Sequence, residues 1–136
     1  MMQFFFYGTL LALAQTRMSR WMAPKIVHSA PATARGRLLA IPAGGGWYPA
    51  MLRGGTGRVV GTVCTLRLGT GDLARLDRYE GKNYRRAKIE LTSRSNARET
   101  AMTYLWNGAL PAGARPVPAG DFLAWLEKTG KRAFGE

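Results

Sequence analysis

Glycine and proline interrupt the apolar sequence so often that only short regular segments fit between them. The chain of 136 residues contains 17 glycines and 7 prolines. Apolar or alternating segments bounded by such breaks predict strands at residues 3–7, 35–41, 47–52, 58–68, 84–91 and 100–106. Runs of helix formers and amphipathic spacing predict helices at residues 10–22, 72–80 and 121–128.

Several strands, few helices and irregular connections favour an α+β fold with a curved sheet or a small barrel. Residues 111–118 contain three prolines, so we do not expect this segment inside a sheet. Hydrophobic residues make up 46% of the chain, enough for a packed core. Neither an internal repeat nor a linker divides the sequence, and we therefore predict one domain over residues 1–136.

Single counts exclude several classes of site. Cys64 is the only cysteine, which excludes an intramolecular disulfide and a cysteine-rich zinc site. His28 is the only histidine, which excludes a multi-histidine metal site. His28 follows two apolar residues in what reads as a connecting segment, and Cys64 lies in an alternating strand, so we interpret both as structural.

The chain is strongly basic, with 20 Lys and Arg against 8 Asp and Glu and a formal charge of +12. The densest basic cluster lies within residues 75–88, yet it contains no run of five basic residues and no aromatic nucleic-acid motif. We interpret it as a solvated face rather than a nucleic-acid site. The charge also suits small substrates that carry carboxylates. Since neither a signal sequence nor an 18-residue apolar run is present, we expect no membrane segment and a cytoplasmic protein.

The segment GDLARLDRYEG at residues 71–81 predicts a helix that starts at Asp72 and ends before Gly81. Helical spacing places two leucines and two carboxylates, Asp77 and Glu80, on one face. An inward Glu80 has its pKa raised by burial, by the like charge of Asp77 and by the negative end of the helix. Such a glutamate is suited to proton transfer near neutral pH. The alternative is an exposed Glu80 neutralised by Arg78 and Lys82.

The segment FYGTL at residues 6–10 places a glycine between a predicted strand and a predicted helix. Glycine lets a ligand approach the backbone, and N–H groups at such a turn bind carboxylates or oxyanions. By itself this turn is weak evidence, because turns of this kind are more often structural connections than binding sites.

Several motifs together carry a resemblance to a known family. FFYGTL, WYPAML, VVGTVCTL, LARLDRYEGKNYRR and VPAGDFLAWL occur in this order over nearly the whole chain. This series resembles the γ-glutamylcyclotransferase-like superfamily, which includes the AIG2-like proteins. The pairing of YGTL with LDxYEGxxYxR is more specific than either motif alone.

The resemblance implies a compact mixed β-barrel flanked by a few short helices, with a cavity at the loop after the first strand. It implies that Tyr7, Gly8, Thr9 and Leu10 hold the γ-glutamyl group and that Glu80 is the catalytic glutamate. It places Tyr84 and Arg86 along the cavity, and it implies neither a metal nor an organic cofactor.

The expected function is release of 5-oxoproline from a γ-glutamyl amine or peptide, with Glu80 as general acid and base. Ring closure joins an amine and a carbonyl of one molecule, so the protein mainly holds a reactive conformer and moves protons. Two alternatives remain open at this point. One is a non-catalytic module of the same fold that binds a small carboxylate, and the other is a basic nucleic-acid-binding protein.

Overall fold

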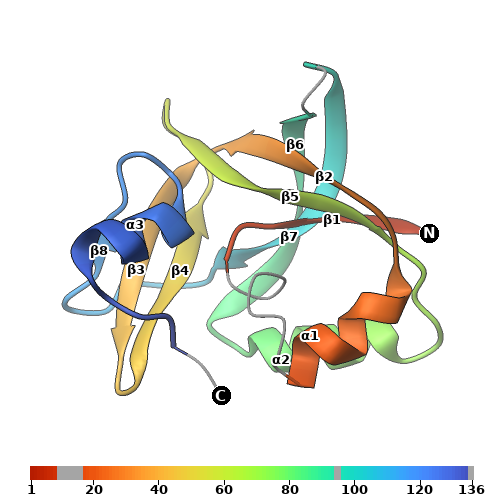
Figure 1. The fold of residues 1–136 in the computed structure, drawn as a ribbon, viewed down its shortest axis with the longest axis horizontal. Helices are drawn as coiled ribbons and strands as arrows, with labels where there is room; N and C mark the ends of the chain where they lie inside the picture. Colours follow the sequence, from red (N-terminus) through yellow and green to blue (C-terminus); the bar gives the residue numbers. More distant parts are fainter. Residues whose placement is uncertain (9–16, 94–95, 135–136) are drawn as a thin grey trace.

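The structure, a computed structural model, describes residues 1–8, 17–93 and 96–134, and its strands form two sheets (Figure 1). Five strands close into a barrel in the order β1-β5-β2-β6-β7, and the second sheet has the order β4-β3-β8. The barrel strands are β1 (Met2–Phe6), β2 (Ile26–Arg35), β5 (Arg58–Leu66), β6 (Tyr84–Ser93) and β7 (Arg98–Trp106). The second sheet consists of β3 (Arg37–Ala43), β4 (Gly46–Leu52) and β8 (Arg115–Pro116).

The barrel is mixed because β1 pairs antiparallel with β5 but parallel with β7. The other barrel pairs, β2 with β5, β2 with β6 and β6 with β7, are antiparallel. The α+β class and the mixed barrel predicted from the sequence are thereby confirmed. Proline is tolerated in β8 because this two-residue strand lies at the edge of its sheet, where a missing N–H costs no ladder bond.

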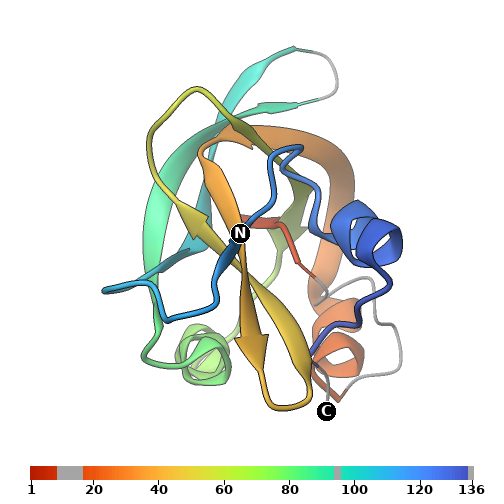
Figure 2. The same cartoon turned by 90° about the vertical axis from the view of Figure 1, so that its left-hand side faces the viewer.

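The helices gather at two places. The short α1 (Arg17–Met22) continues into the 3-10 helix η1 (Ala23–Lys25), and both lie with α2 (Asp72–Glu80) at the lower end of the barrel (Figures 1 and 2). The helix α3 (Phe122–Thr129) packs on the second sheet. None of the helices within the described ranges is long and apolar enough to cross a membrane.

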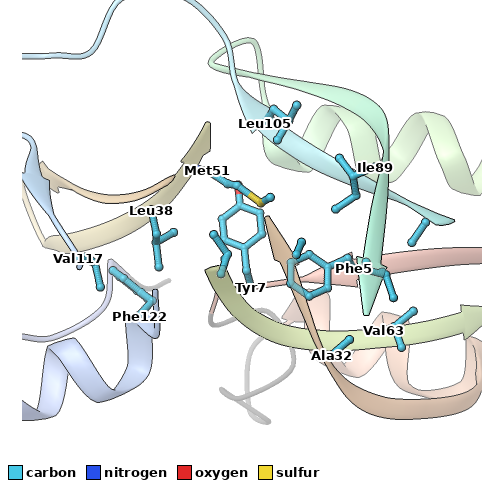
Figure 3. Packing of buried hydrophobic residues seen from close by; sticks show 14 of the residues in the cluster. Phe5, Tyr7, Ala32, Leu38, Met51, Val63, Ile89, Leu105, Val117 and Phe122 are labelled. Atoms are coloured by element: carbon cyan, nitrogen blue, oxygen red, sulfur yellow. The ribbon is translucent and has the colours of Figure 1, made fainter. Parts of the chain in front are cut away.

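The aromatic run of β1 is buried on both of its faces. Side chains alternate across a strand, so Phe4 and Phe6 pack toward the helices, whereas Phe5 and Tyr7 belong to the cluster inside the barrel. Figure 3 shows Tyr7 beside Met51, between Phe5 on one side and the residues of the second sheet and α3 on the other. Burial on both faces fixes the end of β1 as far as Tyr7.

Most predicted elements agree with the structure to within one or two residues, but two predictions are wrong. Residues 111–118 were expected outside any sheet, whereas Arg115–Pro116 form the edge strand β8 and pair with β3. Residues 26–35 form the long strand β2, so His28 lies exposed on a strand and not in a connecting segment. The sequence pattern did not predict this strand, because its fully buried positions are the small Ala32 and Ala34 and because Pro31 interrupts it. The structure confirms the helix predicted at 10–22 from Arg17 onward, and residues 10–16 lie outside the described residues.

Candidate active site

Helix α2 positions Glu80 at its last residue. The helix ends at Gly81, which has φ 83° and donates its N–H to the Asp77 carbonyl at 3.0 Å. Leu76 is completely buried against the helix α1 cluster, whereas Arg75 and Arg78 are exposed, so the helix turns its carboxylate face toward the barrel. Asp77 and Glu80 are both half-buried on that face.

The Asp77 carboxylate is held by two partners from the barrel. Arg86 on β6 donates from Nε to Oδ1 at 3.0 Å and from its terminal nitrogen to Oδ2 at 3.3 Å. The Tyr104 hydroxyl on β7 donates to Oδ1 at 2.6 Å. Burial by itself raises the pKa of Asp77, but the hydrogen bonds from Arg86 and Tyr104 outweigh it and hold that pKa below its ordinary value. Asp77 is therefore charged at neutral pH.

Glu80 has the opposite electrostatic character. Burial, and then the negative charge of Asp77, raise the pKa of Glu80 from 4.5 to about 7. Within the described part of the chain, its carboxylate forms no ion pair, and neither Arg78 nor Lys82 neutralises it. Of the two orientations that the sequence left open, the structure has the inward one. A carboxyl group in this state exchanges a proton near neutral pH.

Tyr7 ties the end of β1 to both sheets. Its buried hydroxyl donates to the carbonyl oxygen of Tyr104 and accepts the N–H of Met51 at 3.3 Å. Burial, and then the charge of Glu80, raise the pKa of Tyr7 above its ordinary value, so the side chain is a neutral hydroxyl. Tyr104 accepts from Tyr7 and donates to Asp77, and it thereby joins the end of β1 to the face of α2 that carries Glu80.

Tyr84 belongs to the same neighbourhood. It begins β6, four residues after Glu80, and its hydroxyl donates to the Pro49 carbonyl of β4 at 2.5 Å. Burial raises the pKa of Tyr84, and electrostatic interactions with Tyr7 and Glu80 add to this rise. Tyr7 and Tyr84, the two hydroxyls coupled electrostatically to Glu80 here, both stay protonated near neutral pH.

Of the other predicted site residues, the structure describes Gly8 and Arg86. Gly8 lies against Pro49, where a Cβ atom at position 8 would come 2.7 Å from the Pro49 Cγ atom. Thr9 and Leu10 lie outside the described residues. The guanidinium of Arg86 binds Asp77, with about a third of the side chain exposed, and so acts on Glu80 through Asp77.

Tyr104 is a site residue that the sequence did not indicate. Its hydroxyl donates to Asp77 and its carbonyl accepts from Tyr7. The sequence gives no sign of this role, because an aromatic residue on a predicted strand is also typical of the core. Cys64 is fully buried, and burial raises its thiol pKa to about 11, in keeping with a core residue. Among the described residues, no three His, Cys, Asp or Glu side chains gather as a metal ion would require.

Several solved structures are similar to this chain. A solution structure of an Arabidopsis thaliana protein is 21% identical, with a TM-score of 0.65 over 95% of this chain and 83% of that one. A structure described as a γ-glutamyl cyclotransferase is 17% identical, with a TM-score of 0.61 over 95% and 86%. An AIG2-like protein from Mus musculus is 20% identical, with a TM-score of 0.59 over 82% and 80%. At such identities the similarity concerns the fold.

The sequence itself gives the family. Among curated proteins, none matches the chain. The family described as "Gamma-glutamyl cyclotransferase, AIG2-like" matches residues 4–124, which include the end of β1, all of α2 and the start of α3. This chain therefore belongs to the AIG2-like γ-glutamyl cyclotransferase family.

Proposed function

We propose that this protein is a γ-glutamyl cyclotransferase that releases 5-oxoproline and a free amine from a γ-glutamyl amine or peptide, with Glu80 as general acid and base. The observation that carries the proposal is the raised pKa of Glu80, about 7, in a carboxyl group half-buried beside Tyr7 at the end of β1. Family membership and the similar fold of a γ-glutamyl cyclotransferase support the same reaction class.

The reaction is an intramolecular exchange of amines at one carbonyl. The Glu80 carboxylate takes a proton from the α-ammonium group of the substrate, and the freed nitrogen attacks the γ-carbonyl carbon. A new C–N bond closes the five-membered ring as the carbonyl becomes an oxyanion. Glu80 then gives this proton to the leaving nitrogen and in the same way transfers the second proton, which the positively charged ring nitrogen must lose. The old C–N bond breaks, the carbonyl re-forms, and the amine departs as an ammonium ion. No atom is gained or lost, and Glu80 ends as it began.

The pKa of Glu80 suits the first proton transfer. An α-ammonium group has a pKa of about 8, so transfer to a carboxylate with a pKa of about 7 is uphill by about one unit, or about 1.4 kcal/mol. An ordinary glutamate would face a gap of about 3.5 units, or about 5 kcal/mol, before any bond forms. Burial and the Asp77 charge thus lower the cost of the step that activates the nucleophile.

The turn after β1 supplies the remaining contacts in this proposal. Backbone N–H groups of residues 7–10 bind the α-carboxylate of the substrate or the oxyanion, as donors at such a turn do in other acyl transfers. The Tyr7 hydrogen bonds to Tyr104 and Met51 support this role because they fix the residue before Gly8. The partner is a small γ-glutamyl compound, and the chemistry requires neither a metal nor an organic cofactor.

The test is 5-oxoproline release from a panel of γ-glutamyl amines and dipeptides. Wild-type protein should release it, whereas Glu80→Gln, which keeps the shape and removes the titratable group, should lower the rate by at least about 100-fold. Glu90→Gln is the matched control because Glu90 is exposed on β6. If Glu80→Gln turns over like the control, Glu80 is not the acid and base. If ligands bind but wild-type protein releases nothing, the non-catalytic binding module is the better description.

A further inference from the structure

Four aromatic side chains from four segments form a contiguous set, here called the aromatic row: Tyr84, Trp106, Tyr48 and Phe134. Tyr84 and Trp106 pack edge to face at 5.4 Å between ring centroids, at the paired ends of β6 and β7. Tyr48 on β4 stacks on Trp106 at 6.2 Å and contacts Tyr84 at 6.4 Å. Phe134 packs its edge on Tyr48 at 6.0 Å and completes the row.

One end of the row lies at the candidate active site. The N–H of Tyr84 donates to the carbonyl of Gly81 at 3.3 Å, and Gly81 directly follows Glu80 at the end of α2, so the backbone holds Tyr84 close to the proposed acid and base. The other end reaches solvent, because Phe134 is 49% exposed while Trp106 is only 7% exposed. Figures 1 and 2 place α2, the β3–β4 hairpin and the C-terminal end of the chain at the same end of the molecule. The row therefore leads outward from Glu80.

The exposed ring of Phe134 is held in place by its backbone. Its N–H donates to the carbonyl of Trp47 at 2.6 Å, and the N–H of Trp47 donates to the carbonyl of Arg132 at 3.0 Å. These bonds join residues 132–134 to Trp47 of β4, which also bridges Ala133. Gly46 allows the close approach, since a Cβ atom there would come 2.6 Å from the Ala133 carbonyl oxygen. An apolar ring is thus fixed at the surface beside the site instead of being buried.

The row offers apolar and π surface rather than free polar groups. The Tyr84 hydroxyl is bound to Pro49 and the Trp106 Nε1 to the Ala109 carbonyl at 3.1 Å. A cationic ligand is the less suitable occupant: the neighbouring Trp47 ring already holds the Lys131 ammonium at 5.1 Å, and the chain carries a formal charge of +12. Neutral aromatic or bulky apolar groups match this surface best.

We infer that the aromatic row, ending at Phe134, is the subsite for the leaving amine, and that the preferred substrates carry a neutral aromatic or bulky apolar group on that amine. This inference rests on the proposed function, because it assigns the part of the substrate that departs. The γ-glutamyl half binds between Glu80 and Gly8 at the end of β1, and the amine substituent extends along Tyr84 and Tyr48 to Phe134.

The experiment compares γ-glutamylbenzylamide with γ-glutamylmethylamide, which differ in the aromatic group on the leaving nitrogen. The ratio of their kcat/KM values is measured in wild-type protein, Phe134→Ala, Phe134→Tyr and Leu123→Ala. Intrinsic reactivity of each amide is the same with every variant, so a change in the ratio reports the subsite. Leu123, exposed on α3, is the matched apolar control.

Phe134→Ala should lower the benzyl-to-methyl ratio about five- to tenfold, the size expected for loss of an aromatic contact. Phe134→Tyr, which keeps the ring, and Leu123→Ala should retain the wild-type ratio. In parallel, calorimetry with Glu80→Gln should show tighter binding of the benzylamide by about the same factor. If 5-oxoproline is released but the ratio is equal in wild-type protein and Phe134→Ala, the inference is overturned.

The binding measurement separates the two possible failures. If neither amide yields 5-oxoproline while Glu80→Gln still prefers the benzylamide, the proposed function fails and the subsite stands. If both amides bind Glu80→Gln equally, the subsite is wrong whatever the turnover shows.

Discussion

The hydroxyl of Tyr7 donates a buried hydrogen bond to the backbone carbonyl of Tyr104. The side chain of the same Tyr104 donates to Asp77 at 2.6 Å. One residue of β7 therefore holds both the end of β1 and the charged neighbour of Glu80. The proposed substrate turn and the proposed acid and base are positioned relative to each other through Tyr104.

Tyr7→Phe should destabilise the fold because it leaves the Tyr104 carbonyl without its donor and the Met51 N–H without its acceptor. We expect a loss of about 1–3 kcal/mol in the free energy of unfolding, measured by urea denaturation. Tyr48→Phe is the control, since the Tyr48 hydroxyl forms no hydrogen bond within the described residues, and it should change the value by less than about 0.5 kcal/mol. Equal losses in the two variants would contradict the role of the Tyr7 hydroxyl.

Gly8→Ala should displace the turn after β1 from Pro49, because the new methyl group would come 2.7 Å from the proline ring. Overpacking of this kind costs about 1–3 kcal/mol. We expect lower stability together with a higher KM for γ-glutamyl substrates. Gly44→Ala is the control, since nothing lies within 4 Å of a Cβ atom at position 44. A Gly8→Ala protein with wild-type KM would show that the turn does not contact substrate.

Asp77→Asn should shift the pH profile of kcat/KM. Glu80 acts first as a base, so activity rises with pH as its carboxyl group ionises, with a midpoint near the pKa of about 7. Removing the Asp77 charge, and freeing the Arg86 cation, both favour the ionised form of Glu80. The midpoint should therefore move to lower pH. Asp72→Asn makes the same change at the first turn of α2 and should leave the midpoint in place; a matching shift there would remove Asp77 from the argument.

Glu80→Gln should stabilise the fold in a pH-dependent way. The folded pKa of Glu80 is about 7 against 4.5 unfolded, so the folded state binds its proton more tightly. That advantage is fully present below pH 4.5 and is lost as pH rises through 7. The variant should match wild-type stability at low pH and exceed it by up to about 3 kcal/mol above pH 7. Urea unfolding at pH 4.5 and pH 8 measures the difference, and Glu90→Gln should show no such trend.

Local signals predicted the parts of the fold and site that depend on neighbouring residues. Helix α2 has the predicted bounds because Asp72 begins it, Gly81 ends it, and its spacing orients Glu80. The same spacing predicted that Asp77 and Glu80 share a face. Burial of Glu80 and the charge of Asp77, the two causes of its raised pKa in the structure, were both predicted from that spacing.

Long-range pairings were not readable from the sequence. Asp77 and Tyr104 are 27 positions apart, and Tyr7 and Tyr104 are 97 apart, so only the closed barrel shows that they bond. The second sheet could not be predicted for the same reason. Residues 35–41 and 47–52 were predicted as strands, but only their pairing with each other shows that they lie outside the barrel. The role of Phe134 depends on the pairing of residues 132–134 with β4, for which the sequence carries no local sign.

The parallel pairing of β1 with β7 has a consequence for how the protein is made. Phe4 pairs with Met102, so the first strand cannot complete the ring until most of the chain has left the ribosome. Until then the apolar side chains of β1 have no finished interior to enter. The turn at Gly8 and the acid at position 80 thus come together only late in synthesis, and a nascent chain cut short before β7 should be inactive and an early target for chaperones.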